Sequence, residues 1–287
     1  MTPPGGADAP ASVTPDTWLE LLDALQHQSW NPALRRFRSP YVFRGQGRAA
    51  PLTTSLQRLT PQASELERHV VRAFRKYALG TSAPQDSVWA WLALGQHHGL
   101  PTRLLDWTYS PLVALHFATL SLRDADQDGV IWMLDHARIR DTLPANLQDV
   151  LEREGSTVFT SDLLTLLSAQ HARDTDLPFD REMGWLTSLS PDRPFLMFLE
   201  PPSLDARVIA QAALFSLLSH TVASLEDWIT AHPDTARQVV VPAALKAEVR
   251  DRLDQMNITE RTLFPDLGGL SAWLARYYRA APEEDIP

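Results

Sequence analysis

The segment that decides the fold is 96–108, which reads QHHGLPTRLLDWT. Residues 88–98 are mostly apolar and fit a helix that the following glycine and proline bring to an end. Residues 102–108 then leave no room for a long loop before Ser110 and Pro111, a pair typical of a helix start. The sequence therefore predicts a helix, a strand that ends in a turn, and a second, apolar helix.

Further strands and helices are expected on both sides of this segment, from β-prone runs and from apolar residues at helical spacing. The expected strands are 41–43, 129–134, 195–199 and 238–241, and the expected helices are 17–25, 64–78, 243–256 and 270–278. Residues 136–192 form a less regular, helix-leaning insertion, and 208–218 fit a strand or a helix. Strands separated by helices without strict alternation predict an α+β fold, with a central mixed or antiparallel sheet flanked by helices.

The composition excludes several classes of function. The chain has 287 residues, 44% of them hydrophobic, and its 26 lysines and arginines against 35 aspartates and glutamates give a net charge of −9. This acidic balance argues against generic binding to polyanions. The absence of cysteine excludes disulfides, thiolate metal sites and cysteine nucleophiles. No apolar stretch approaches the roughly 18 residues that span a bilayer, so we expect a cytoplasmic protein with no membrane partner.

The two ends of the chain are rich in proline, glycine or acidic residues. We therefore expect a flexible N-terminal tail at 1–15, a single domain at 16–280 and a C-terminal tail at 281–287.

The usual catalytic motifs are missing: the sequence has no Gly-x-Ser-x-Gly, Walker, Gly-x-Gly-x-x-Gly or His-Glu-x-x-His motif. Three other segments place polar residues where a core would exclude them. The first is Phe43-Arg44-Gly45-Gln46, in which an arginine follows an apolar strand and glycines permit close approach of a ligand. Arg44 suits bidentate binding of a phosphate or of the ribose-nicotinamide part of a dinucleotide. The alternative is a structural ion pair.

The second segment is 95–108, the densest polar and aromatic cluster in the chain. His97 and His98 are adjacent on the end of a helix and point about 100° apart, so we do not expect them to serve one site or to bind a metal together. The alternative to a metal site is a capping histidine beside a hydrogen-bonded core histidine.

The same segment contains Thr102, Asp106 and Thr108, which alternate with apolar neighbours. One face of a strand would then be polar and could line a pocket. The alternative is that Arg103 and Asp106 form an internal ion pair that fixes a turn.

The third segment is 207–216, where Gln211 interrupts an apolar run. A buried glutamine needs several hydrogen-bond partners, which a ligand or a backbone clamp can supply. Because Arg44, Asp106 and Gln211 are each polar in an apolar context, we predict that they converge around one pocket.

Together these segments resemble the FRG family, bacterial domains named for the element seen here as Phe43-Arg44-Gly45-Gln46. The resemblance covers about 38–280. It further includes Pro51-Leu52, Ser55-Leu56, Arg58, the helix from Glu65 to Phe74, the run from Gln96 to Thr108, Ser110-Pro111, Ala114-Leu115, Phe117-Ala118, Arg207, Gln211, Phe215 and the run from Thr262 to Leu267.

The order of these elements is also similar to that of ADP-ribosyltransferases of the Arg-Ser-Glu type. In that resemblance Arg44 corresponds to the arginine of the first strand, Thr108 or Ser110 to the Ser/Thr element, and Gln211 to the final glutamate. It implies a split ADP-ribosyltransferase-like core in which Arg44 holds a phosphate or ribose of NAD and Trp107 or Tyr109 stacks on the nicotinamide.

Gln211 departs from that pattern, because a neutral amide supplies only the hydrogen bonds of the glutamate that it replaces. Asp106 or Glu200 is then expected to supply the missing charge. The resemblance thus implies three catalytic residues, Arg44, Asp106 and Gln211. The residues implied in substrate binding are Gly45, Gln46, His97, Thr102, Arg103, Trp107, Thr108 and Ser110.

The leading hypothesis is an enzyme that takes NAD as substrate, without a metal, and transfers ADP-ribose to a protein or nucleic-acid acceptor or cleaves NAD. Such an enzyme would suit a bacterial toxin or a phage-defence effector. One alternative is a noncatalytic module that senses nucleotides or binds proteins. Another is a hydrolase or nuclease that uses His97 or His98.

Overall fold

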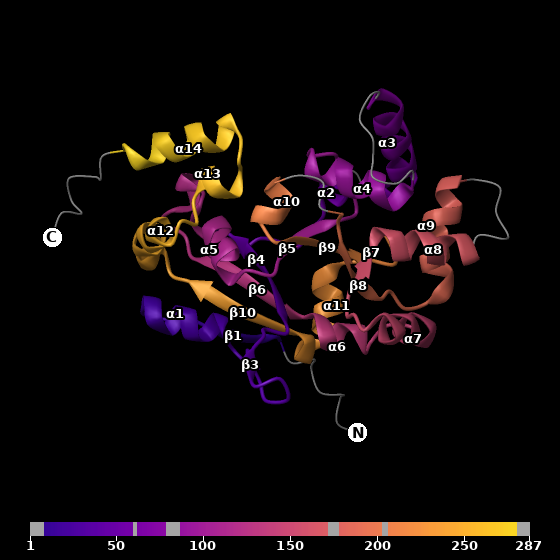
Figure 1. Ribbon diagram of the computed structural model, residues 1–287, viewed down its shortest axis with the longest axis horizontal. Coiled ribbons are helices and arrows are strands. Elements are labelled where there is room, and N and C mark those ends of the chain that lie inside the picture. The colour runs from indigo at the N-terminus through magenta and orange to yellow at the C-terminus, as the bar shows by residue number, and fades with distance from the viewer. Residues whose placement is uncertain (1–8, 60–61, 79–86, 172–177, 203–205, 280–287) are drawn as a thin grey trace, which may run out of the picture.

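The protein is described here by a computed structural model, which places residues 9–59, 62–78, 87–171, 178–202 and 206–279. A mixed eight-stranded sheet runs through the molecule in the order β1-β10-β6-β4-β5-β9-β8-β7 (Figure 1). The β1–β10 and β7–β8 pairs are parallel and the other neighbours are antiparallel. The predicted α+β class and mixed central sheet are confirmed.

The strands of this sheet are β1 Ala11–Val13, β4 Tyr41–Gln46, β5 Leu105–Thr108, β6 Gly129–Asp135, β7 Phe159–Thr160, β8 Leu196–Glu200, β9 Ala213–Leu218 and β10 Ala236–Val241. A separate hairpin joins β2 Trp30–Asn31 to β3 Arg36–Phe37.

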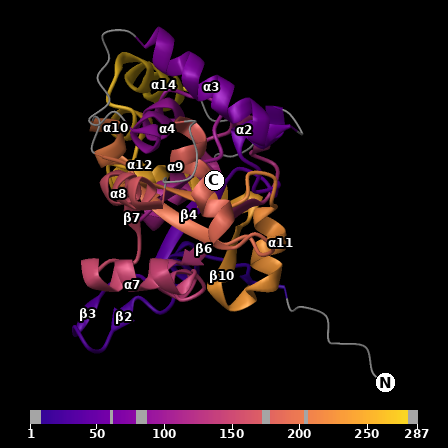
Figure 2. The same ribbon diagram turned by 90° about the vertical axis from the view of Figure 1, so that its right-hand side faces the viewer.

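The α-helices are α1 Trp18–Leu25, α2 Ser55–Leu59, α3 Ala63–Tyr77, α4 Val88–His97, α5 Pro111–Thr119, α6 His136–Arg140, α7 Ala145–Glu154, α8 Ser161–His171, α9 Pro178–Leu189, α10 Ala206–Ala210, α11 Leu225–Ala231, α12 Lys246–Gln255, α13 Glu260–Leu263 and α14 Leu267–Tyr277. Short 3-10 helices at Leu122–Asp124, Pro233–Thr235 and Ala243–Leu245 connect some of them. Figure 2 shows α3 lying across one end of the molecule, beyond α4.

Three hydrophobic clusters hold helices against both faces of the sheet. One packs α1, α5 and α12 against β4, β6 and β10, and it includes Phe43. A second packs α4, α7, α8 and α9 against β8 and β9. The third includes Val42 and covers the opposite side of β4 and β6 with α11. Because Val42 and Phe43 are neighbours on β4, their separation between two clusters reflects the alternation of side chains along a strand.

The structure corrects the expected tails and two expected elements. Ala11–Val13 lies within the expected 1–15 tail but forms β1, paired in parallel with β10. Residues 1–8 and 280–287, which include the 281–287 tail, lie outside the described residues. The strand expected at 102–108 is shorter, since β5 begins at Leu105. The ambiguous 208–218 segment contains the end of α10 and then β9, so both alternatives hold in part.

The shortest pairing between neighbouring strands of the sheet joins β4 to β5. These two strands share a single pair, Phe43 with Thr108, whereas β4 is paired with β6 from Tyr41 to Gln46. The two strands therefore part next to Arg44, the residue that follows Phe43 on β4. Among the described residues, no helix is long and apolar enough to cross a membrane.

Candidate functional site

A cavity of about 690 Å³ opens where β4 and β5 part. Its walls come from both strands, from α2, from the C-terminal end of α4, from α5, and from the α10–β9 turn. The volume lies within the range typical of small-molecule sites. Arg44, Asp106 and Gln211 all line this cavity, so the prediction that they converge on one pocket is confirmed.

Arg44 carries a positive charge that no carboxylate of the described residues pairs with. Its Nη1 donates to the backbone carbonyl of Asp106 at 2.8 Å, and its buried Nε has no hydrogen-bond partner. Burial lowers the pKa of the Arg44 guanidinium, an effect that the nearby Asp106 opposes and Arg58 reinforces. Within the described parts of the chain no carboxylate lies within ion-pair distance of Arg44, so the structural ion pair considered from the sequence is not formed. A planar donor group is thus left facing the cavity.

Asp106 is the only carboxylate among the described residues that line the cavity. Its Oδ2 accepts a hydrogen bond of 2.9 Å from Nε2 of Gln96, and Oε1 of Gln96 accepts one of 2.6 Å from Thr102. Thr102 is fully buried and does not line the cavity. The structure therefore places Thr102, expected in substrate binding, behind Gln96: it orients Gln96, which in turn orients the carboxylate.

Arg103 is bound to Glu67 rather than to Asp106 or to the cavity. Its Nε donates to both carboxylate oxygens of Glu67 at 2.8 Å, and its Nη2 adds a further contact. Both side chains are buried, at 8% and 0% exposure. This pair corrects the expected Arg103–Asp106 ion pair and the expected role of Arg103 in substrate binding.

Gln211 lies in the turn between α10 and β9, next to Ala212, whose φ is +45°. Its Nε2 donates to the carbonyl of Leu263 at 3.0 Å, which ties the turn to α13. The backbone carbonyl of Gln211 accepts a bond of 2.7 Å from the hydroxyl of Thr108. Gln211 therefore lines the cavity and also binds a backbone carbonyl, so it fits both alternatives that the sequence allowed, a ligand contact and a backbone clamp.

The hydroxyls of Thr108 and Ser110, which the resemblance implied in substrate binding, serve the backbone instead. Oγ1 of Thr108 binds Gln211 and also accepts from the amide of Ser110 at 3.0 Å. Ser110 caps α5 by accepting from the amide of Val113 at 3.4 Å, and it is not among the described lining residues. Thr108 lines the cavity as expected, but its hydroxyl already donates one hydrogen bond and accepts another within the protein.

Gly45 lines the cavity as expected, whereas Gln46 does not. A Cβ atom on Gly45 would lie 1.8 Å from the carbonyl oxygen of Ala114, so this glycine also lets α5 approach β4 closely. Oε1 of Gln46 accepts from Nε1 of Trp132 at 3.2 Å, and Gln46 does not line the cavity.

Trp107 and Tyr109, the aromatic residues expected to stack on a nicotinamide, form hydrogen bonds within the protein. Trp107 borders the cavity but is only 3% exposed; its Nε1 donates to Ser216 at 2.8 Å. The hydroxyl of Tyr109 donates to Glu200 at 2.6 Å, and neither Tyr109 nor Glu200 lines the cavity. Phe117 of α5 is the partly exposed aromatic residue of the described lining. Its ring is available for packing against an apolar or planar part of a ligand.

His97 and His98 both line the cavity, and their ring centroids are 5.0 Å apart. The expectation that adjacent histidines do not serve one site is therefore wrong: His97, the last residue of α4, and His98, its C-cap residue, border the same cavity. In the part of the chain that the structure describes, no group of three or more His, Asp or Glu side chains is arranged to hold a metal.

Three lining residues were not identified from residue chemistry alone: Arg58 of α2, Arg207 of α10 and Phe117. The carbon Cζ of Arg207 lies 4.8 Å from the ring centroid of Phe264, on the loop after α13. With Arg44 they give the described lining three arginines against one aspartate. The signal available in the sequence was the absence of any acidic residue between Asp23 and Glu65. Such a cavity favours an anionic ligand.

Comparison with known proteins gives a family match, and the matched segment contains most of the residues that line the cavity. No curated protein and no solved structure matches the chain. Residues 39–127 match the family model of the FRG domain. The matched segment runs from β4 through α5 and contains Arg44, Asp106, both cavity histidines and Phe117. The chain therefore contains an FRG domain, and that domain supplies most of the cavity wall.

Proposed function

We propose that the cavity binds NAD and that the protein is an ADP-ribosyltransferase-like enzyme, which transfers ADP-ribose to a macromolecule or cleaves NAD. The observation that carries the proposal is the guanidinium of Arg44, which lines the cavity with a buried, unpartnered Nε and no carboxylate in its ion-pair range among the described residues. Burying a cation without a counter-charge is costly, so a ligand that brings negative charge would relieve the cost.

A dinucleotide suits the remaining features of the wall. A pyrophosphate offers oxygens that match the two-point donor fork of arginine. Arg58 adds a second cation at the same cavity, and Phe117 offers an apolar ring for a base or the nicotinamide. The parting of β4 and β5 beside Arg44 supports the proposal, because it opens the sheet next to that arginine.

Asp106 is proposed as the catalytic carboxylate. In this reaction the bond between the nicotinamide nitrogen and the ribose C1′ breaks, nicotinamide leaves, and an acceptor oxygen or nitrogen forms the new bond at C1′ while its proton passes to a base or to water. Positive charge develops on the ribose before the new bond is complete. A carboxylate held in place by Gln96 would stabilise that charge. Glu200 is less suited, because it accepts from Tyr109 outside the cavity.

Binding without turnover is the second candidate, and one set of contacts favours it. The hydroxyl of Thr108 and the amide nitrogen of Gln211 are both bound to backbone groups, so neither is free to assist the chemistry. A noncatalytic nucleotide-sensing module would need only the arginines and the aromatic ring.

A single assay separates these functions. Purified full-length protein is incubated with NAD, with and without candidate protein and nucleic-acid acceptors, and free nicotinamide and ADP-ribose adducts are measured by mass spectrometry. Transfer or cleavage predicts release of nicotinamide in amounts that exceed the amount of protein. Saturable binding of NAD by calorimetry without nicotinamide release would establish the sensing function instead. Neither binding nor release would reject both.

A further inference from the structure

The β2–β3 hairpin is a separate structural unit that stands out from the body of the molecule (Figures 1 and 2). Trp30 pairs with Phe37 and Asn31 with Arg36, and the four residues between the strands form its tip. The hairpin precedes β4 and lies outside the segment that matches the FRG domain. Figure 1 places it on the opposite side of the sheet from α2, α4 and α10, which border the cavity. Its role is therefore separate from that of the cavity.

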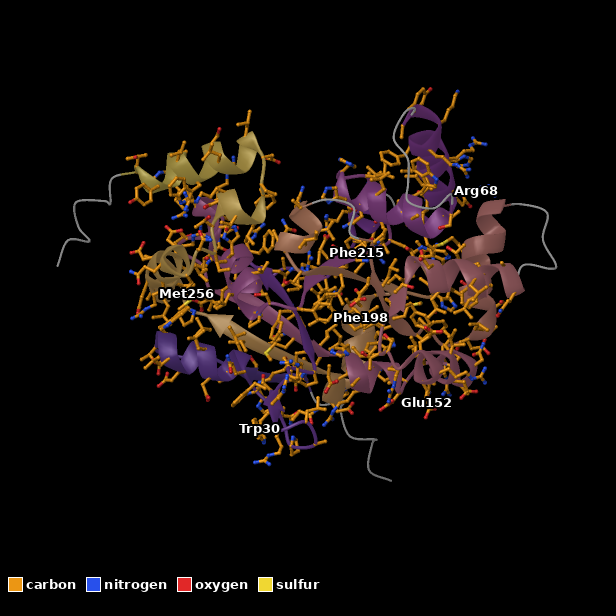
Figure 3. All side chains as sticks on the ribbon, in the orientation of Figure 1. Trp30, Arg68, Glu152, Phe198, Phe215 and Met256 are labelled. Atoms are coloured by element: carbon orange, nitrogen blue, oxygen red, sulfur yellow. The ribbon has the colours of Figure 1, made fainter. Side chains whose placement is uncertain are left out.

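The hairpin exposes three large apolar side chains within eight residues. Trp30 is 50% exposed, Leu34 at the tip 60% and Phe37 65%. Trp30 and Phe37 pack on each other, with ring centroids 5.1 Å apart. Figure 3 shows the labelled Trp30 on this projecting unit, away from the sheet. Exposed aromatic residues gathered on one projection mark an interaction surface more often than a folding requirement.

Three arginines surround these apolar groups: Arg35, Arg36 and Arg38. All three are exposed, and within the described residues none forms an ion pair. The guanidinium of Arg38 donates only to the carbonyl of Phe37, its own neighbour. In a chain of net charge −9, a hairpin with three cations and no acidic residue is complementary to an anionic partner.

The register of the hairpin narrows the class of that partner. Trp30 and Phe37 lie opposite each other on one face, so Asn31 and Arg36 lie on the other. A nucleic-acid strand or an acidic peptide laid on one face would meet either the aromatic rings or Arg36, but not both. A bilayer interface surrounds an inserted tip and meets both faces: apolar side chains enter the acyl boundary while arginines reach lipid phosphates.

We propose that the β2–β3 hairpin docks the protein on the surface of an anionic phospholipid membrane, with Leu34 and the Trp30–Phe37 pair entering the interface and the three arginines binding lipid phosphates. This proposal departs from the sequence expectation of no membrane partner, which rested on the lack of a spanning segment. The charge of the hairpin is opposite to the net charge of the chain, and salt screens the repulsion between distant parts of the body and the lipid.

The test uses the full-length protein and vesicles of phosphatidylcholine alone or with phosphatidylglycerol, separated by sedimentation. We expect binding to the anionic vesicles that weakens as salt rises. The triple variant Arg35→Gln, Arg36→Gln, Arg38→Gln should bind about 100-fold more weakly, since each cation near an anionic surface contributes roughly a factor of five. The triple variant Trp30→Ser, Leu34→Ser, Phe37→Ser should lose binding by at least about tenfold.

Matched controls are Arg153→Gln on α7 and Leu267→Ser on α14, both exposed and far from the hairpin in sequence. Neither should change vesicle binding, and thermal melting should show that all variants fold. Failure of the wild-type protein to bind anionic vesicles, or binding that survives both triple variants, would overturn the proposal. So would binding of a single-stranded oligonucleotide that is lost with the arginine variant, in the absence of vesicle binding.

Discussion

Two arginines beside β5 differ in their partners: one forms an ion pair with a carboxylate and the other, among the described residues, does not. Just before the strand, Arg103 is buried with Glu67 and both charges are satisfied within the protein. Across the strand, Arg44 reaches the cavity with a backbone carbonyl as its partner and a buried Nε that has none. The difference separates structure from function: a paired arginine fixes the fold, whereas one that lacks a counter-charge in the folded protein points to a ligand.

Paired charges also occur where α5, α12, α13 and α14 meet. Glu260 accepts from Arg250 at 2.8 Å and from Arg276 at 2.7 Å, and Arg276 also binds Asp254. His116 on α5 faces Nη1 of Arg250 at 2.9 Å. These contacts hold α13, and through Leu263 the Gln211 turn, against the helix that borders the cavity. These ion pairs thus stabilise the part of the cavity wall formed by α5 and the Gln211 turn, and Arg44 lines the same cavity.

The largest loss of stability is expected when the buried Arg103–Glu67 pair loses its carboxylate. Glu67→Gln leaves the guanidinium of Arg103 buried without a counter-charge, and we expect the free energy of unfolding to fall by about 3–5 kcal/mol. Denaturant unfolding monitored by circular dichroism measures it. Glu154→Gln, an exposed residue at the end of α7, is the matched control and should change stability by less than about 0.5 kcal/mol. A Glu67 loss no larger than that of the control would contradict the structural role of the pair.

Replacement of Asp106, the carboxylate of the cavity, should lower NAD turnover rather than stability. Asp106→Asn keeps an oxygen for Gln96 but removes the charge, so we expect NAD turnover to fall about 100-fold, equivalent to about 2.7 kcal/mol. Affinity for NAD should stay the same or rise, because an anionic ligand no longer meets a like charge. Turnover is followed by nicotinamide release and affinity by calorimetry, with the exposed Asp149→Asn as control. Full turnover in the Asp106 variant would remove this residue from the chemistry.

The helical junction predicts a pH dependence of stability. Burial, reinforced by Arg250, lowers the pKa of His116 from 6.5 to about 4. The unfolded chain therefore binds a proton that the folded protein resists, and stability should fall as pH drops from 6.5 toward 4. The loss due to His116 should be about 2 kcal/mol between pH 7 and pH 5.

Glu260 extends the loss to lower pH. Burial by itself raises the pKa of Glu260, but hydrogen bonds from Arg276 and the charges of Arg250 and Arg276 lower it from 4.5 to about 2. Its contribution to stability is complete above pH 4.5 and is lost as pH falls toward 2. Unfolding free energies of the wild type and of His116→Gln, measured from pH 7 to pH 5, should differ in slope. Parallel curves would contradict the assignment to His116.

The smallest effect concerns a hydroxyl that the sequence placed in the substrate site. Because Ser110 caps α5, Ser110→Ala should lower stability by about 1 kcal/mol and leave NAD affinity unchanged. Thermal melting and calorimetry on the same preparation measure both. A tenfold loss of affinity at unchanged stability would return Ser110 to the ligand site.

Local patterns were enough to predict most elements and the meeting of the three polar residues. The helix before β5 and the apolar helix after it follow from periodicity and from the Ser110-Pro111 start. Arg44, Asp106 and Gln211 each interrupt an apolar context, which indicated shared burial in one cavity.

The roles of individual side chains were not predictable in the same way, because each depends on a partner brought in by the fold. Glu67 lies on α3, 36 residues before Arg103, and nothing local selects it over Asp106. The glycine at 45 permits strand and helix to touch, a need that becomes visible only when α5 is seen against β4. The β2–β3 hairpin was missed because its strands are only two residues long and carry no periodic signal.

The most direct test compares Arg44→Lys with Arg103→Lys, with NAD affinity and unfolding free energy measured on each. Lysine keeps the charge but loses the planar donor fork in both variants. The account predicts that Arg44→Lys weakens NAD binding about 30- to 1000-fold, equivalent to about 2–4 kcal/mol, and leaves stability nearly unchanged. Arg103→Lys should destabilise the protein and leave the affinity of the folded fraction intact. Unchanged NAD affinity in Arg44→Lys, or a loss of stability matching that of Arg103→Lys, would contradict the claim that Arg44 is held for a ligand.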